Sequence, residues 1–263
     1  MMGKRKQSLL FFIVLLFLSS CSNQEHSSAS KKEPISLTIS AAASMQDVLE
    51  QIKQNFEEEH SDIKLTFNFG SSGALQQQIS QGAPVDLFFS AAKDKLQRLI
   101  EDGLIKEEDH IDLVKNNLVL ITNKKSDNNI TSFLDLQTLS KEKIAIGIPE
   151  SVPAGGYAKE TLQSLHIWDK LQENIVPAKD VRQVLSYVET NNVTAGIVYG
   201  TDAKTSNSVQ VIAIAEESSH SPIVYPIGII KNSQNYQAAK VFYNYMQTTT
   251  SLKVFEEYGF IAN

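Results

Sequence analysis

Apolar and polar residues follow an order from residue 35 onward that predicts strands followed by helices. Residues 35–40 alternate at period two, as in a half-buried strand, and apolar residues then recur at helical spacing between residues 48 and 56. The same order appears twice more, with expected strands at 63–69 and 85–90 and an expected helix after each. Repetition of strand and helix predicts a parallel sheet with helices on both faces.

A second group of apolar segments predicts another α/β lobe. Strands are expected at residues 144–148, 195–199 and 209–214, and helices at 156–165 and 181–189. Two apolar segments, 118–121 and 223–230, lie where the chain would cross to this lobe and return. We predict an α/β fold with two mainly parallel sheets: lobe I comprises residues 35–116 and 227–263, and lobe II comprises 117–226. Ligands of such sheets bind beyond the carboxyl ends of the strands, here in a cleft between the lobes.

The N-terminal segment predicts export and attachment to a membrane. Residues 1–21 have a basic start and an apolar run shorter than the ~20 residues of a membrane span, so we expect a signal peptide. Cys21 is the single cysteine, which excludes an intramolecular disulfide, and its place after Leu-Ser-Ser resembles a bacterial lipobox. The alternative is an ordinary signal peptide with an incidental cysteine. Residues 22–34 are polar and predict a flexible tether.

The charge balance makes nucleic-acid binding a poor interpretation. The chain has 24 basic and 30 acidic residues, a net charge of -6, and cleavage before Cys21 would remove three positive charges and leave -9. Nucleic-acid binding usually needs a basic face. An acidic chain also gives no long-range attraction for an anion, so an anion site would depend on local donors.

Several predicted helix starts offer such donors. Ser44 and Ser72 follow expected strands at positions typical of helix N-caps. Ala154 and Val181 lie at the starts of two further expected helices, where backbone N–H groups lack an intrahelical partner. Each helix start carries roughly half a positive charge, and Tyr199, which ends an expected strand, would add a neutral hydroxyl donor. Together these groups predict a site for a small oxyanion.

A pocket that contains only donors would favour oxyanions without a proton. Hydrogen phosphate carries an O–H that needs an acceptor, and an unmet buried donor costs ~1–3 kcal/mol. Molybdate, tungstate and sulfate carry no proton at neutral pH. The argument holds if no carboxylate lines the pocket.

Each of these residues also has a purely structural interpretation. Ser44 and Ser72 are compatible with plain N-caps, and Tyr199 with a packed aromatic residue. Arg182, next to Val181, is compatible with an anion ligand, but on a helix a structural ion pair is favoured. The prediction of a site depends on the conjunction of these residues.

Seven motifs occur in order along the chain. They are Ala41-Ala42-Ala43-Ser44, Gly70-Ser71-Ser72, residues 82–91 (GAPVDLFFSA), Val152-Pro153-Ala154-Gly155, Asp180-Val181-Arg182, residues 196–203 (GIVYGTDA) and residues 255–260 (FEEYGF). With these motifs the chain resembles the molybdate-binding proteins of ABC transporters from Ile35 to Phe260.

The resemblance implies a two-lobed periplasmic-binding-protein fold of type II and capture of molybdate, with tungstate as a second ligand. In that family the ligand is held by groups that match the hydroxyls of Ser44, Ser72 and Tyr199 and the backbone amides of Ala154 and Val181. Whether a hydroxyl from Ser71 also contacts the ligand is left open.

The resemblance further implies no catalysis and no cofactor. The partners would be a membrane permease and its ATPase. The protein itself would be a monomer outside the cytoplasm, attached to the bacterial cell membrane through lipid on Cys21. A receptor of the same fold for sulfate or another oxyanion is the alternative function.

Other functions receive less support from the residues. A serine hydrolase would need one of the histidines as a base, but Gly70-Ser71-Ser72-Gly73 is not a nucleophile elbow. The histidines, none of which lies in a catalytic or metal-binding motif, are His26, His60, His110, His166 and His220. Two acidic runs, 57–59 and 107–109, are interpreted as solvated helix ends. An amino-acid receptor would need an acidic and a basic group in the cleft, and a sugar receptor aromatic platforms, whereas Trp168 is the single tryptophan.

Overall fold

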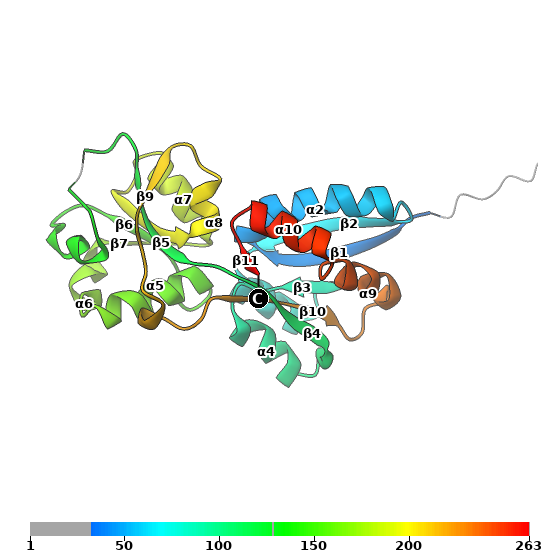
Figure 1. Ribbon diagram of the computed structural model, residues 1–263. Coiled ribbons are helices and arrows are strands. Elements are labelled where there is room, and N and C mark those ends of the chain that lie inside the picture. The colour runs from blue at the N-terminus through cyan, green and yellow to red at the C-terminus, as the bar shows by residue number, and fades with distance from the viewer. Residues whose placement is uncertain (1–32, 128, 263) are drawn as a thin grey trace, which may run out of the picture. The chain divides into compact units, whose positions relative to one another are not determined.

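Two mixed β-sheets, each covered by helices, organise the chain from residue 34 onward (Figure 1). The computed structural model describes residues 33–127 and 129–262, and the chain from Pro34 to its end forms one unit. The predicted signal peptide, Cys21 and all but the last two residues of the predicted tether lie outside the described residues. Among the residues described, no helix has both the length and the apolar character to cross a membrane.

The first sheet combines strands from both ends of the described chain. Its order is β11-β4-β10-β3-β1-β2, with β1 parallel to β2 and β3, and β10 antiparallel to β3 and β4. The strands are β1 (Ile35–Ala42), β2 (Ile63–Gly70), β3 (Leu87–Phe89), β4 (Ile105–Lys115), β10 (Val224–Ile230) and β11 (Ile261–Ala262). The helices around it are η1 (Ala43–Met45), α2 (Gln46–Glu59), α3 (Ser72–Ser80), α4 (Lys93–Glu101), α9 (Tyr236–Tyr245) and α10 (Thr249–Glu257).

The second sheet is formed by the middle of the chain. Its order is β7-β6-β8-β5-β9, with β6 parallel to β7 and β8, and β5 antiparallel to β8 and β9. The strands are β5 (Leu118–Asn123), β6 (Ile144–Gly147), β7 (Ile175–Ala178), β8 (Ala195–Tyr199) and β9 (Val209–Ile214). The helices are η2 (Phe133–Thr138), α5 (Pro153–Ser164), α6 (Trp168–Leu171), η3 (Gln172–Asn174), α7 (Val181–Glu189), α8 (Gly200–Lys204) and η4 (Glu217–Ser219).

The chain passes between the sheets twice. It leaves the first sheet after β4, at Lys115, and returns to it with β10, at Val224. The two apolar segments that were expected to cross are β5 and β10. The second sheet is therefore inserted into the first in sequence. The exact lobe boundaries stay a prediction.

The predicted fold class is confirmed, with one difference in the sheets. They are mixed and not mainly parallel, because β10 in the first sheet and β5 in the second run against their neighbours. A strand that returns from the other sheet enters from the opposite end, so its antiparallel direction follows from the insertion.

One prediction about the acidic runs is wrong. Residues 57–59 end α2 as expected, but residues 107–109 lie within β4 and do not form a helix end. Asp109 is only 2% exposed, and its carboxylate accepts from the Tyr236 hydroxyl at 2.7 Å and pairs with Lys240 at 3.3 Å. These partners come from α9, about 130 residues along the chain, so local pattern does not show them.

The helical periodicity of α2 places one apolar face in the core. Val48, Leu49, Ile52 and Phe56 are buried, and the Phe56 ring lies edge-on to that of Phe242 with centroids 4.9 Å apart. Burial of apolar area at this spacing is what holds a surface helix on its sheet. The packing fixes η1, the short turn between β1 and α2, which carries Ser44.

Candidate functional site

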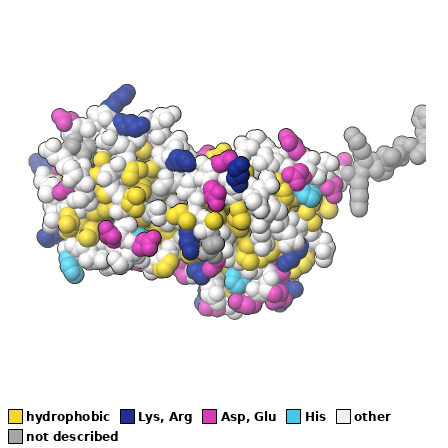
Figure 2. All heavy atoms as spheres, in the orientation of Figure 1, with side chains coloured by type: hydrophobic (Ala, Val, Ile, Leu, Met, Phe, Trp, Pro, Cys, Tyr) yellow, Lys and Arg dark blue, Asp and Glu magenta, His cyan; other side chains and the backbone are white. Residues whose placement is uncertain are grey.

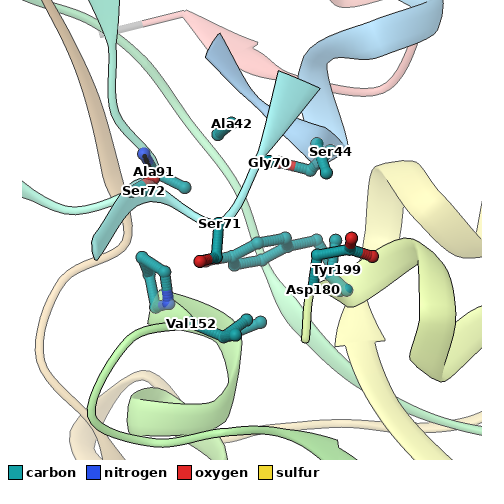
Figure 3. Close-up of a pocket in the computed structure, with 13 residues that line it drawn as sticks. Ala42, Ser44, Gly70, Ser71, Ser72, Ala91, Val152, Asp180 and Tyr199 are labelled. Atoms are coloured by element: carbon teal, nitrogen blue, oxygen red, sulfur yellow. Dashed lines mark hydrogen bonds between the residues drawn. The ribbon is translucent and has the colours of Figure 1, made fainter. Parts of the chain in front are cut away.

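Loops from the two sheets surround one small cavity (Figure 3). Its volume is about 10 Å³, near the smallest space that holds a water-sized group. The first sheet contributes Ala42, Ala43, Ser44, Gly70, Ser71, Ser72 and Ala91, and the second contributes Val152, Pro153, Ala154, Asp180, Val181 and Tyr199. All five residues expected to hold a ligand are among them, and the cavity admits only a compact group.

Ser44 lies in η1, directly after β1, and is 4% exposed. Its hydroxyl does not cap a helix: the N-cap of α2 is Met45, without a side-chain hydrogen bond. The Ser44 Oγ atom lies 3.0 Å from the Tyr225 hydroxyl instead. The N-cap interpretation of Ser44 is therefore wrong, and its side chain is available to the cavity.

Ser72 was considered both as a helix N-cap and as a ligand donor, and the structure gives the N-cap position to Ser71. Ser71 is the N-cap of α3, where its Oγ accepts from the backbone N–H of Ala74 at 3.4 Å. Ser72 is the first residue of the helix and is fully buried, and its Oγ accepts from the backbone N–H of Ala91 at 2.9 Å. A hydroxyl that accepts still has a hydrogen of its own to donate. Both serines therefore remain potential donors into the cavity.

Ala154 and Val181 present backbone N–H groups at two helix starts in the second sheet. Ala154 follows Pro153 at the beginning of α5, and Val181 is the first residue of α7. N–H groups in the first turn of a helix have no intrahelical acceptor. Both residues are almost completely buried and line the cavity.

The Tyr199 hydroxyl is an isolated donor. Tyr199 ends β8, is 1% exposed, and its hydroxyl oxygen has no hydrogen-bond partner among the described residues. Burial raises the pKa of Tyr199 well above its ordinary value, so the group keeps its proton. A buried donor without an acceptor costs stability, which a bound acceptor would recover.

Asp180 places a carboxylate at the cavity. The argument for a pocket that contains only donors required that no carboxylate line it, and this requirement is not met. Asp180 is the N-cap of α7, as the sequence predicts, and its Oδ1 accepts from the backbone N–H of Gln183 at 2.8 Å. One of its oxygens is thus engaged with the helix. The Asp180 carboxylate nevertheless lies beside the cavity.

Arg182 takes no part in lining the cavity. Its guanidinium pairs with Asp47 of α2 and lies 3.2 Å from Asp202 of α8. Burial raises the pKa of Asp202 to about 7, with Arg182 acting in the opposite direction. The expectation of a structural ion pair for Arg182 agrees with these contacts. No lysine, arginine or histidine is among the cavity-lining residues of the described chain.

Two residues behind the cavity have no signal in the sequence. Tyr225 lies near the start of β10 and contacts Ser44, and Asn116 lies between β4 and β5 and donates to Tyr225. In sequence, Tyr225 is one apolar residue of a buried strand and Asn116 one polar residue of a turn. Their relation to Ser44 depends on pairings over more than 100 residues, which only the fold shows.

The serines of the cavity lack the partners that a hydrolase requires. Ser44 contacts a tyrosine hydroxyl and Ser72 a backbone N–H, and neither partner is a general base. Among the described residues, no group of three or more His, Cys, Asp and Glu side chains is placed to hold a metal ion.

Known proteins with similar sequences share a common description. The model of a family described as bacterial extracellular solute-binding protein matches residues 37–261. The chain is 54% identical over 241 residues to a protein of Bacillus subtilis (strain 168) named "Putative ABC transporter substrate-binding lipoprotein YvgL", covering 92% of this chain and 91% of that protein. It is 38% identical over 229 residues to the molybdate-binding protein ModA of Haemophilus influenzae, covering 86% and 90% of the two chains.

A solved structure supports the same architecture. The periplasmic molybdate-binding protein of Azotobacter vinelandii superposes with a TM-score of 0.77 at 24% identity, covering 86% of this chain and 99% of that one. This likeness shows the fold. The names of these relatives describe binding proteins and not enzymes, in agreement with the expectation of no catalytic activity.

Proposed function

The chain belongs to the bacterial extracellular solute-binding proteins, and on this premise we propose that it captures molybdate, and also tungstate, for uptake by an ABC transporter. The observation that carries the proposal is the cavity itself. Among the described residues it is lined by hydroxyls and helix starts, with the carboxylate of Asp180 and no cationic side chain. The family predicted from the sequence motifs is confirmed, and relatives named for molybdate support this ligand.

Five residues would hold the ion. The hydroxyls of Ser44, Ser72 and Tyr199 would donate to it, and so would the backbone N–H groups of Ala154 and Val181 at the two helix starts. A doubly charged oxyanion stabilises these helix starts through their positive ends. Donation to an ionised acceptor is roughly twice as strong as between neutral groups, so five donors can replace the hydration of a small dianion without a cation.

The sheets are already joined across the cavity in this structure. The backbone N–H of Gly73 in α3 donates to the carbonyl oxygen of Ser151 at 2.9 Å, and Arg182 pairs with Asp47. Separation of the two sheets would break both contacts. We therefore propose that binding closes the two lobes by a hinge at the two connections between the sheets, near residues 116 and 223.

Calorimetry of the protein lacking residues 1–21 tests the ligand. We expect tight binding of molybdate and tungstate at neutral pH and weak or absent binding of sulfate and phosphate. Binding of sulfate with silence toward molybdate would keep the receptor fold and make the alternative oxyanion receptor correct. Binding of an amino acid or a sugar alone would contradict an oxyanion cavity.

We also propose that the mature protein is a monomer, attached to the cell membrane by lipid on Cys21 and serving a permease and its ATPase. A relative named as a substrate-binding lipoprotein supports this anchor. Replacement of Cys21 by serine should move the protein from the membrane fraction to the soluble fraction. A variant that stays in the membrane fraction would contradict the lipid anchor without affecting the ligand.

A further inference from the structure

We propose that Tyr225 and Asn116 are positioning residues that make the Ser44 hydroxyl a fixed donor toward the bound anion, and that they thereby contribute to selection against protonated oxyanions. The proposal rests on the proposed function, because it concerns residues directly behind the same cavity. Neither residue lines the cavity, so both would act through Ser44.

The side chain of Asn116 has a defined orientation. Its Oδ1 accepts from the backbone N–H of Asn117 at 2.9 Å, which places the amide nitrogen on the opposite side. That nitrogen donates to Thr201 Oγ1 at 2.9 Å and to the Tyr225 hydroxyl at 3.3 Å. An amide nitrogen can only donate. The Tyr225 oxygen is therefore the acceptor in this contact.

The direction of the next hydrogen bond is set when a ligand accepts from Ser44. The Tyr225 hydroxyl has one hydrogen, and Ser44 Oγ lies 3.0 Å from its oxygen. Burial raises the pKa of Tyr225 well above its ordinary value, so the hydrogen stays on the phenol. The ring is held edge-on by Tyr199 and Phe260, with centroid distances of 5.6 and 5.3 Å. Either hydroxyl can be the donor in this contact. When Ser44 gives its hydrogen to a ligand oxygen, its own oxygen can only accept from Tyr225, so Tyr225 then donates to Ser44.

With a ligand bound, Ser44 would accept from Tyr225 and give its own hydrogen to a ligand oxygen. Its Oγ lies 3.0 Å from the Tyr225 hydroxyl, and the residue lines the cavity. Hydrogen bonds in a chain of this kind strengthen one another. A ligand O–H at the same point would meet a hydrogen where it needs a lone pair. The chain from Asn116 through Tyr225 to Ser44 therefore favours an ion without a proton.

The two sides of the cavity are linked by the same amide. Thr201 belongs to α8, which begins directly after Tyr199, whereas Tyr225 belongs to the first sheet. Asn116 itself lies at the first connection between the sheets. Asn116, which orients the Tyr225 hydroxyl beside Ser44, is therefore in contact with residues of both sheets.

A double-mutant cycle on the mature protein separates positioning from a general effect on stability. We expect Tyr225→Phe to weaken molybdate binding by about tenfold, because it removes the hydrogen bond from Tyr225 that supports donation by Ser44 to a charged ligand. The ratio of molybdate to phosphate affinity should fall by a similar factor. In the Ser44→Ala background the same replacement should change molybdate affinity by less than about twofold, because its target is gone.

Tyr245→Phe is the matched control. Tyr245 is also a buried tyrosine, and its hydroxyl donates to Glu59 at 3.2 Å, away from the cavity. The control should melt at a lower temperature and bind molybdate as the unmodified protein does. Asn116→Asp is a second variant: its carboxylate would attract the Tyr225 hydrogen away from Ser44, so we expect the same loss of molybdate affinity and of selectivity.

Two results would overturn the proposal. One is an equal effect of Tyr225→Phe with and without the Ser44 hydroxyl, and the other is binding by both variants indistinguishable from that of Tyr245→Phe. A failure of the unmodified protein to bind any of the four oxyanions would instead overturn the proposed function, and the two failures are thus separable.

Discussion

The hydroxyl of Tyr199 has opposite effects on the empty and the occupied protein. Without a partner it costs about 1 kcal/mol or more of folding stability. We expect Tyr199→Phe to leave the melting temperature of the ligand-free protein unchanged or higher, while molybdate binding weakens by roughly tenfold. Ser44→Ala should weaken binding further, since it removes the donor supported by Tyr225. Calorimetry and thermal melting check both effects, and unchanged affinity in both variants would contradict the assigned site.

Asp180 provides a test with the opposite sign. Asparagine is as good an N-cap as aspartate, so Asp180→Asn should keep α7 intact while removing a negative charge beside the anion. We expect molybdate affinity to rise by about fivefold, equivalent to ~1 kcal/mol of relieved repulsion. Titration calorimetry at fixed ionic strength measures it. Weaker binding with an unchanged melting temperature would mean that the carboxylate assists the ligand.

Individual residues differ in how far the sequence reveals them. Ser72, Ala154 and Val181 could be placed at the cavity because helix starts follow from local pattern and the motifs name them. Ser44 lies at the cavity as expected. It is not an N-cap, because a short 3-10 turn comes between β1 and α2 and makes Met45 the N-cap instead. Tyr225 has no local signal, since its role depends on which chain segment lies behind Ser44.

An ion pair between Asp47 and Arg182 joins helices α2 and α7. Asp47 and Arg182 are partly exposed, and pairs of this kind contribute roughly 0.2–1 kcal/mol. We expect Asp47→Asn to weaken molybdate binding by about two- to fivefold at low salt, because the pair joins a helix of each sheet and would be lost in the proposed open form. The difference should shrink at high salt.

The control for this ion pair is Glu101→Gln. Glu101 pairs with Arg98 on the exposed face of α4 at 3.8 Å and does not line the cavity. It should leave molybdate affinity unchanged at every salt concentration. Equal behaviour of the two variants would show that the ion pair between α2 and α7 does not contribute to closure.

At the level of elements, periodicity predicts helices better than it predicts charged strands. The range expected for α7 matches the structure, because its apolar face repeats cleanly and Asp180 marks its start. β4 was missed because residues 107–109 are acidic, whereas in the fold their strand lies between β10 and β11 and Asp109 finds partners on α9. A strand stabilised by distant partners has no local pattern to detect.

The whole molecule should respond to pH through Asp202. Its pKa of about 7 lies above the ordinary 3.8, so between those values the folded protein holds a proton that the unfolded chain has released. Folding stability then falls as the pH rises from about 4 to 7 and levels off above that. We expect Asp202→Asn to flatten this part of the profile.

Thermal melting of the ligand-free protein at pH 5 and pH 8 measures the effect. The melting temperature of Asp202→Asn relative to the unmodified protein should be higher at pH 8 than at pH 5 by a few degrees. A parallel shift at both values would mean that the Asp202 carboxyl is already ionised at pH 5, as a dominant effect of Arg182 would cause.

The described residues on the face shown in Figure 2 form no basic patch that would attract anions over a long range. On the face shown in Figure 2, basic and acidic side chains lie interspersed, in keeping with a net charge of -6. Association of an anion should therefore be slower at low ionic strength than with a basic receptor. Once inside, the ion depends on the donors of the cavity alone.

The position of β3 has a consequence for how the chain is made. β3 pairs with β1 on one side and with β10 on the other, and β10 follows the entire second sheet in sequence. During synthesis β3 therefore has an open edge until residues 224–230 emerge, although the second sheet can already be complete. Open strand edges invite pairing with other chains, and distant pairings form slowly. Nascent chains that stop before residue 224 should be the form of this protein most dependent on chaperones.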